Sequence, residues 1–178
     1  MIKLVILDVD GVMTDGTKYY DRDGKVVLKV FCDKDWTAIK RLRAIGIDVV
    51  FITGDPYNEM ILSNRNLPTI VNRGEGFHRD KINFLPQALE EYNCTADEVV
   101  YFGDDLFDYK IMEGVGYAYC VNDSPRSLQD ISVPLHCNGG ENAIMYLFEE
   151  LEDRELIPTV PAGDVMDKIY ELDLKEKF

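Results

Sequence analysis

The sequence predicts an α/β fold, a doubly wound Rossmann-like sheet of parallel strands. Short apolar runs such as residues 2–7 and 47–52 are typical of strands buried on both faces of a parallel sheet. Segments with helical spacing of apolar residues, such as 33–45, separate these runs. Strands that alternate with helices give a parallel sheet with right-handed crossovers. A chain of 178 residues can bury one sizeable core and need not split.

The N-terminal part of the chain contains a strand, a hairpin and a helix. The strand is expected at 2–7 and a β-hairpin insertion at 17–31, because Asp23-Gly24 is a strong turn signal between two β-rich runs. The helix at 33–45 is expected to end before Gly46, which suits a helix C-terminus. Its apolar positions are Trp36, Ile39, Leu42 and Ile45.

The remainder of the core alternates regularly. Pro56 is expected to open a helix, because proline is tolerated in the first turn. The expected strands are 47–52, 69–71, 98–102, 117–121 and 132–135, and the expected helices are 56–66, 80–92, 106–113, 125–129 and 143–152. We therefore expect a single domain over 1–153, with no large cap domain, and a C-terminal extension or arm over 154–178. Within that arm, 164–178 could form a short amphipathic helix that packs on a neighbouring subunit, or it could be disordered.

Composition narrows the classes of partner and the compartment. The formal net charge of −14 argues against nucleic acid or an anionic membrane surface as a partner. The apolar run at the N-terminus is too short for a signal peptide, and no stretch approaches the ~18 apolar residues of a membrane span. The four cysteines show no Cys-x-x-Cys spacing, so we expect small, unpaired side chains in a reducing, cytoplasmic setting: Cys32, Cys94, Cys120 and Cys137.

Two carboxylates follow the first strand directly. Asp8 and Asp10 stand two residues apart, so on an extended backbone they would point the same way. Like charges at a strand end are unfavourable unless a positive group lies between them, and Mg²⁺ prefers carboxylate oxygens. Parallel sheets bind ligands beyond the carboxyl ends of their strands. The alternative is that each aspartate only forms a turn or caps a helix.

Three further segments carry candidate chemistry. Thr53-Gly54 ends the second strand, where a hydroxyl and backbone N–H groups could hold a phosphate, although such a pair is also a common turn. Lys81 alone would be an ordinary solvated charge. An apolar strand ends again at Gly103 and is followed by three acids, of which capping would explain one or two: Asp104, Asp105 and Asp108.

The segment that follows the first strand is Asp8-Val9-Asp10-Gly11-Val12-Met13-Thr14-Asp15-Gly16. This segment resembles the first motif of the haloacid dehalogenase superfamily of phosphatases. Its form is most similar to the small, capless branch that includes 3-deoxy-D-manno-octulosonate (KDO) 8-phosphate and 2-keto-3-deoxynononate (KDN) 9-phosphate phosphatases. The resemblance covers about residues 1–150.

The resemblance assigns a role to each candidate residue. It implies that Asp8 is the nucleophile, that Asp10 is the acid and base, and that Thr53, Gly54 and Lys81 bind the phosphoryl group. It also implies a Mg²⁺ cofactor held by Asp8, by Asp10 through its backbone carbonyl and by Asp104, with Asp105 and Asp108 supporting the metal shell.

The same resemblance implies a homotetramer built on the hairpin, and a small phosphorylated sugar acid as substrate. Asp55 stands where octulosonate phosphatases carry arginine, and an acid there is closer to the sialic-acid branch. Asp55 is therefore a candidate substrate contact, and so are Arg65, Arg73 and Arg79. The alternatives are a non-catalytic oligomerisation module of the same fold, or a phosphatase of another small sugar or nucleotide phosphate.

Overall fold

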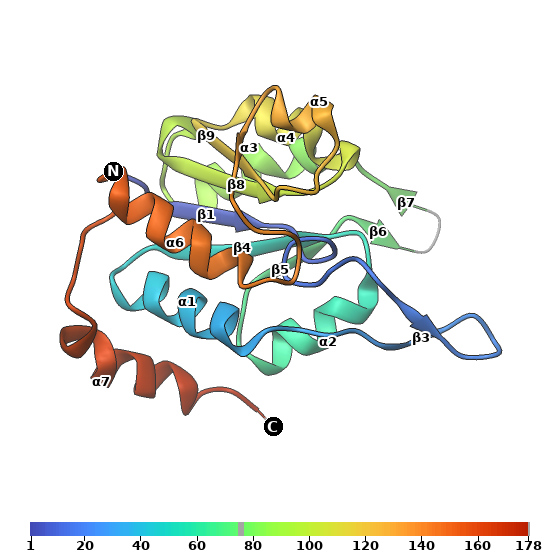
Figure 1. Cartoon of the computed structure of the whole chain (residues 1–178), viewed down its shortest axis with the longest axis horizontal. Helices are drawn as coiled ribbons and strands as arrows, with labels where there is room; N and C mark the ends of the chain where they lie inside the picture. The colour runs from blue at the N-terminus through green and yellow to red at the C-terminus, as the bar shows by residue number, and fades with distance from the viewer. Residues whose placement is uncertain (75–76, 178) are drawn as a thin grey trace.

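A six-stranded parallel sheet forms the centre of the molecule, as the sequence predicts (Figure 1). The computed structural model describes residues 1–74 and 77–177. The strand order is β10-β9-β8-β1-β4-β5, so the chain leaves β1 toward one edge and returns to build the other. The strands are β1 (Leu4–Leu7), β4 (Asp48–Thr53), β5 (Thr69–Val71), β8 (Val99–Gly103), β9 (Tyr117–Cys120) and β10 (Val133–Pro134).

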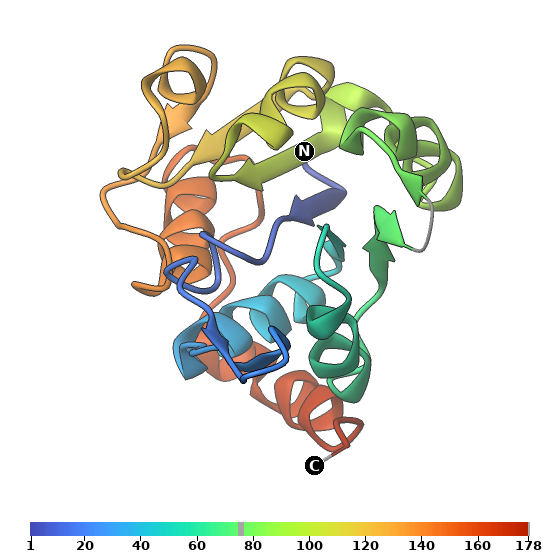
Figure 2. The ribbon, with the colours of Figure 1, turned by 90° about the vertical axis from the view of Figure 1, so that its right-hand side faces the viewer.

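Helices cover both faces of this sheet, which explains the unbroken apolar runs in its central strands. Val5 and Leu7 point into the core beneath α1 (Asp33–Ala44), α2 (Pro56–Asn64) and α6 (Ala143–Asp153). Leu4 and Ile6 point into the opposite core. That second core lies beneath α3 (Leu85–Glu91), α4 (Tyr109–Gly114) and α5 (Arg126–Gln129). Figure 2 shows the sheet between these two layers.

Two small antiparallel pairs leave the core at the carboxyl edge of the sheet. The hairpin β2 (Tyr19–Tyr20) and β3 (Val26–Leu28) lies within the predicted range 17–31. The second pair, β6 (Arg73–Gly74) and β7 (Phe77–His78), occupies a stretch for which the sequence predicts only a loop. In the described part of the chain neither pair amounts to a separate cap domain, as expected.

Two predicted helices begin with a 3₁₀ turn. The helix expected at 80–92 is divided into η1 (Lys81–Phe84) and α3, because Pro86 has no N–H and fits only the first turn of an α-helix. The helix expected at 106–113 begins with η3 (Leu106–Asp108), which a capping box between Asp105 and Asp108 closes. A further 3₁₀ turn, η2 (Ala96–Glu98), precedes β8.

The C-terminal arm forms α7 (Ala162–Asp173), which lies against the outer side of α1 of its own chain, beyond the two layers of helices that cover the sheet (Figure 1). Val165 and Leu172 are buried in this contact. Beyond the helix, Glu176 forms ion pairs with Lys40 at 3.1 Å and with Arg65 at 2.9 Å. The arm is therefore tied to the domain by apolar and ionic contacts.

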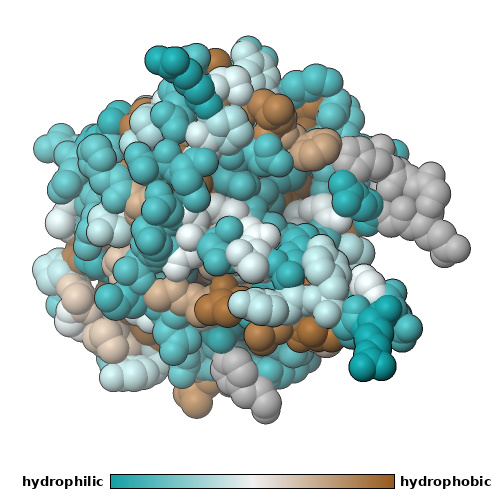
Figure 3. Space-filling view, turned by 45° about the vertical axis from the view of Figure 1, so that its right-hand side comes forward, coloured by the Kyte–Doolittle hydropathy of each residue, from teal (hydrophilic) through white to brown (hydrophobic). Residues whose placement is uncertain are grey.

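The surface agrees with the acidic composition. The face in Figure 3 is mostly hydrophilic, and its hydrophobic side chains lie in small groups. Over residues 1–74 and 77–177, every helix is too short or too polar to cross a membrane.

Candidate active site

A cavity of about 440 Å³ opens at the carboxyl ends of β1, β4 and β8. Parallel strands bring these ends together where the strand order reverses, so residues distant in sequence meet there. The cavity is lined by most of the predicted site residues, namely Asp8, Asp10, Thr53, Gly54, Asp55, Lys81, Asp104 and Asp105. Asp108 lies behind them and is completely buried.

Asp8 and Asp108 share one buried lysine. The Nζ of Lys81 lies 2.9 Å from Asp8 Oδ2 and 2.6 Å from Asp108 Oδ1. Burial raises the pKa of Asp8 to about 6, with Lys81 opposing and Asp108 adding to the shift. Burial alone would lower the pKa of the Lys81 amine, but the two carboxylates raise it above its ordinary value. The lysine is therefore a fixed positive charge at the floor of the cavity.

Asp108 has hydrogen bonds on both oxygens. Its Oδ1 also accepts from the Tyr101 hydroxyl at 2.5 Å, and its Oδ2 accepts from the backbone N–H groups of Asp104 and Asp105 at 2.9 and 3.1 Å. Asp108 thus fixes the turn that carries Asp104 and orients Lys81. Asp105 is exposed at the cavity mouth and accepts from the backbone N–H of Leu106.

The arrangement fits a divalent metal. Carboxylate oxygens of Asp8, Asp104 and Asp108 lie within 4.8 Å of one another. Asp104 Oδ1 is buried and has no hydrogen-bond partner among the described residues. Burial, together with the charges of Asp8 and Asp108, raises the pKa of Asp104 to about 9. A buried oxygen without a donor beside two other acids is the environment that a hard cation stabilises.

Two glycines make room for this cluster. Gly11 has a φ of +87°, and a Cβ at this position would collide with the Asp104 carboxylate. A Cβ on Gly103 would collide with the Asp108 carboxylate. The loops after β1 and β8 can therefore pack together only because Gly11 and Gly103 have no side chain.

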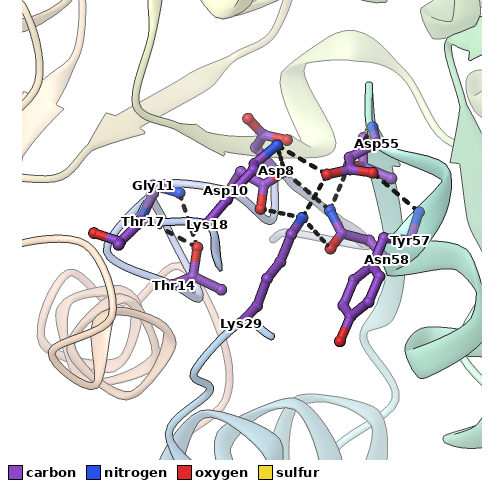
Figure 4. Close-up of polar contacts among 12 residues, drawn as sticks. Asp8, Asp10, Gly11, Thr14, Thr17, Lys18, Lys29, Asp55, Tyr57 and Asn58 are labelled. Atoms are coloured by element: carbon purple, nitrogen blue, oxygen red, sulfur yellow. Dashed lines mark hydrogen bonds and ion pairs between the residues drawn. The ribbon is translucent and has the colours of Figure 1, made fainter. Parts of the chain in front are cut away.

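The Asp10 carboxylate belongs to a different network from that of Asp8 (Figure 4). β1 ends at Leu7, so the alternation of an extended strand does not reach Asp10. Its Oδ1 accepts from Lys29 Nζ at 2.6 Å. Its Oδ2 accepts from Asn58 Nδ2 at 3.2 Å and lies 3.2 Å from Lys18 Nζ. The argument from an extended strand therefore does not apply to Asp10, although the side chains of Asp8 and Asp10 both line one cavity.

Asp55 joins the same network rather than standing free for substrate. Its Oδ2 lies 2.8 Å from the Nζ atoms of both Lys18 and Lys29, and its Oδ1 caps α2 through the Tyr57 N–H. Burial alone would raise the pKa of Asp55, but the bonds from Lys18 and Lys29 lower it to about 2. Asp55 is thus an anion held between two lysines.

The three candidate arginines lie in different places. Arg73 lines the cavity, and its Cζ would lie 3.9 Å from a Cβ on Gly54. Arg65 stacks on the Trp36 ring at 4.1 Å and pairs with Glu176 of the arm. Arg79 directly follows β7, and its backbone is bound to Asn72: the Arg79 N–H donates to the Asn72 carbonyl, and the Arg79 carbonyl accepts from Asn72 Nδ2. Among the described lining residues, Arg73 is the arginine that faces the site.

Four residues in or behind the cavity were not predicted from the sequence: Lys18, Lys29, Asn58 and Tyr101. Lys18 and Lys29 flank the hairpin strands, and Asn58 stands in the first turn of α2. One signal was available, because Lys29 interrupts an otherwise apolar run from Val26 to Phe31. A lysine within a short strand segment is an ordinary surface residue unless the fold shows what it faces.

Comparisons with known proteins agree with this geometry. The family model for haloacid dehalogenase-like hydrolases matches residues 77–145. The 3-deoxy-D-manno-octulosonate 8-phosphate phosphatase KdsC of Yersinia pestis is 35% identical over 145 residues, which are 80% of this chain and 75% of that protein.

Solved structures are similar over most of the chain. The cobalt-bound octulosonate phosphatase of Haemophilus influenzae has a TM-score of 0.78 at 26% identity and covers 86% of this chain and 90% of its own. The Moraxella catarrhalis enzyme, in complex with magnesium, phosphate and KDO, has a TM-score of 0.75 at 25% identity. It covers 85% of this chain and 86% of its own. The resemblance noted in the sequence is confirmed: the chain belongs to the haloacid dehalogenase-like hydrolases and is a phosphatase of that family.

Proposed function

We propose that this phosphatase hydrolyses the phosphate monoester of a small sugar acid, of the KDO 8-phosphate or KDN and sialic acid 9-phosphate type, through an aspartyl-phosphate on Asp8. The observation that carries the proposal is the pairing of Asp8 with buried Lys81, next to a buried Asp104 oxygen that has no described hydrogen-bond partner. The three side chains that would serve as nucleophile, phosphate-binding cation and metal ligand line one cavity.

In the first step, an Asp8 oxygen attacks phosphorus and the bond from phosphorus to the leaving alcohol oxygen breaks. Asp10 gives its proton to that oxygen, so a neutral alcohol departs and Asp8 carries the phosphoryl group. In the second step, water attacks the same phosphorus, Asp10 accepts a proton from it, and inorganic phosphate leaves. The Asp8 carboxylate is then restored.

Other residues hold the transferring group. The Thr53 hydroxyl and the backbone beside Gly54 would bind phosphoryl oxygens, and Lys81 would neutralise part of their charge. Asp8 and Asp104, with the Asp10 backbone carbonyl, would hold Mg²⁺. Bound there, Mg²⁺ would supply positive charge that offsets the charge on the transferring group.

The substrate class is inferred from the relatives and from Arg73. The relatives named above act on KDO 8-phosphate, and the Moraxella catarrhalis structure contains KDO and phosphate. Arg73 lines the cavity beside Gly54. A guanidinium there suits the carboxylate of a sugar acid. Arg73→Ala is therefore expected to raise KM for sugar-acid phosphates more than for neutral hexose phosphates.

Phosphate release from a substrate panel tests the proposal. The panel holds KDO 8-phosphate, KDN 9-phosphate, sialic acid 9-phosphate, hexose phosphates and nucleotides, each with Mg²⁺ and with EDTA. We expect Mg²⁺-dependent turnover that Asp8→Asn abolishes and that Asp153→Asn, a surface exchange of the same kind, leaves intact. A folded chain that releases no phosphate from any member would contradict the proposal and favour the non-catalytic module.

A further inference from the structure

We propose that Lys29, with Asn58, is a positioning residue that aims the Asp10 carboxylate at the leaving group. This inference rests on the function proposed above. Lys29 follows β3 at the base of the hairpin and comes from outside the core motifs, yet its side chain is completely buried in the site. Asp8 and Asp10 thus each have a buried lysine of their own, Lys81 for Asp8 and Lys29 for Asp10.

The Lys29 amine has no spare hydrogen. It donates to Asp10 Oδ1 at 2.6 Å, to Asp55 Oδ2 at 2.8 Å and to Asn58 Oδ1 at 2.8 Å (Figure 4). An ammonium group has three N–H donors, and all three are used. The amine is therefore fixed in direction as well as in charge, and it cannot also bind substrate without losing a partner.

Asn58 connects this lysine to the phosphate-binding threonine. Because its Oδ1 faces Lys29, its Nδ2 faces the acceptors Asp10 Oδ2 at 3.2 Å and Thr53 Oγ1 at 2.8 Å. Thr53 Oγ1 also accepts from the Asp55 N–H at 3.2 Å. With its oxygen accepting two bonds, the threonine can turn its own O–H toward a phosphoryl oxygen. Asn58 thus orients the binder of the phosphoryl group and the acid next to it together.

Both oxygens of Asp10 are held by this arrangement, one by Lys29 and one by Asn58. Lys18 also reaches Asp10, but its side chain is 25% exposed and is shared with Asp55. Without Lys29, the carboxylates of Asp10 and Asp55 would face each other across the vacated space, and Asp10 would turn toward Lys18. Removal of Lys29 would therefore misdirect the proton donor and leave Asp8, Lys81 and Asp104 in place.

The dependence on the leaving group distinguishes this role from a purely structural one. The value of kcat/KM reports the steps up to departure of the alcohol. The p-nitrophenolate of p-nitrophenyl phosphate leaves as a stable anion and needs no proton, whereas a sugar alkoxide does. General acids contribute about 10²–10⁴-fold to such steps. A misdirected Asp10 should therefore slow only the alkyl ester.

The experiment compares wild type, Lys29→Met and the matched surface control Lys34→Met on p-nitrophenyl phosphate and on the best alkyl ester of the panel. For Lys29→Met we expect kcat/KM to fall by about 100-fold with the alkyl ester, within the range of a general acid. With the aryl ester it should stay near the wild-type value. Lys34→Met should match wild type on both, since Lys34 is exposed.

Asn58→Ala provides a second route, because it removes one of the two groups that hold Asp10 and keeps the buried charge. It should slow both esters, because its bond to Thr53 is lost, but it should slow the alkyl ester more, because its bond to Asp10 is lost as well. The difference between the two esters decides the question if Lys29→Met does not fold by circular dichroism. Equal losses on both esters, or no loss on either, would overturn the role of Lys29 while the proposed function stands. If the wild type hydrolysed neither ester, the proposed function would fall and this inference with it.

Discussion

Asp104 is an acid whose charge the metal-free chain stabilises poorly. Its pKa of about 9 is far above that of the unfolded chain, because it is buried beside Asp8 and Asp108. At pH 7.5 the Asp104 carboxylate must therefore take up a proton when the chain folds, or remain charged while buried. Either state lowers the free energy of unfolding. A divalent cation bound to Asp104 removes this loss of stability, and an asparagine at the same position avoids it because its amide carries no charge.

Asp104→Asn should therefore raise the melting temperature of the metal-free protein and remove the response to Mg²⁺. For wild type at about 100 times Kd, Mg²⁺ should add roughly 2.7 kcal/mol, a rise of about 5–10 °C for a chain of this size. Thermal unfolding with Mg²⁺ and with EDTA measures both effects, and Asp153→Asn serves as the control. An undiminished Mg²⁺ shift in Asp104→Asn would contradict the assignment of this ligand.

Asp35 makes stability depend on pH. It is completely buried in α1, and its Oδ1 accepts from the N–H groups of Ile144 and Met145 at the start of α6. Its Oδ2 has no partner among the described residues. Burial raises its pKa from 3.8 to about 6, and the two N–H groups oppose the shift. The folded chain therefore binds more protons than the unfolded chain between about pH 4 and pH 6.

The stability contributed by protonated Asp35 is present below about pH 4 and is lost as pH rises through 6, a change on the order of 2–3 kcal/mol. Asp35→Asn keeps an acceptor for α6 and removes this dependence. We expect it to be more stable than wild type at pH 7.5 and to lose that advantage at pH 4.5. Urea unfolding at both pH values measures the difference, and a difference independent of pH would rule out Asp35 as its source.

At the site, the sequence pattern predicted positions that follow strands, the family resemblance added Lys81, and the residues of the hairpin and of α2 were missed. Asp8, Thr53 and Asp104 each lie at the end of an apolar strand. A parallel sheet brings such strand ends together regardless of the conformation of the loops. Lys29 and Asn58 come from a hairpin and a helix turn that are 29 residues apart. Their meeting depends on where the base of the hairpin lies relative to α2, which no local pattern encodes.

At the scale of elements, the core strands were predictable because burial on both faces leaves an uninterrupted apolar run. β5 lies at the residues expected for it, and β4 lies within one residue of the range expected. The β6–β7 pair was missed because its segment has charged residues and glycine instead of alternating apolar residues. The 3₁₀ turns were missed because a proline and a capping box act on a single turn within a helical pattern.

The arm should stabilise the domain through α7. Leu172 is 8% exposed in the contact with α1, so Leu172→Ala should lower stability by about 2 kcal/mol, the low end for a leucine at the margin of a core. Leu174, in the same arm, is 86% exposed, and Leu174→Ala should change nothing. Chemical denaturation compares the two variants. Equal stabilities would mean that the arm does not hold to α1 in solution.

For the whole molecule, the hairpin leaves large apolar side chains exposed in the single chain. It projects from the body beyond the carboxyl edge of the sheet (Figure 1). Tyr19, Tyr20, Val27, Leu28 and Val30 are each at least half exposed. A two-stranded ribbon with such side chains invites pairing with another chain. The base of the same hairpin carries Lys29, so a partner that clamps the ribbon would also steady the Asp10 network.

We therefore expect the protein to assemble through this hairpin, and the family resemblance implies a homotetramer, four copies of the 20.4 kDa chain. Val27→Asp places a charge on the ribbon, away from Lys29, and should shift the mass measured by light scattering toward that of one chain. Because freed hairpins no longer hold Lys29 firmly, alkyl-ester turnover should fall with dissociation and recover at high protein concentration. Met60→Asp, at an equally exposed apolar position on α2, should leave the mass unchanged. A wild-type protein that stays monomeric at every concentration would show that the ribbon is stable alone, and that the site is complete within one chain.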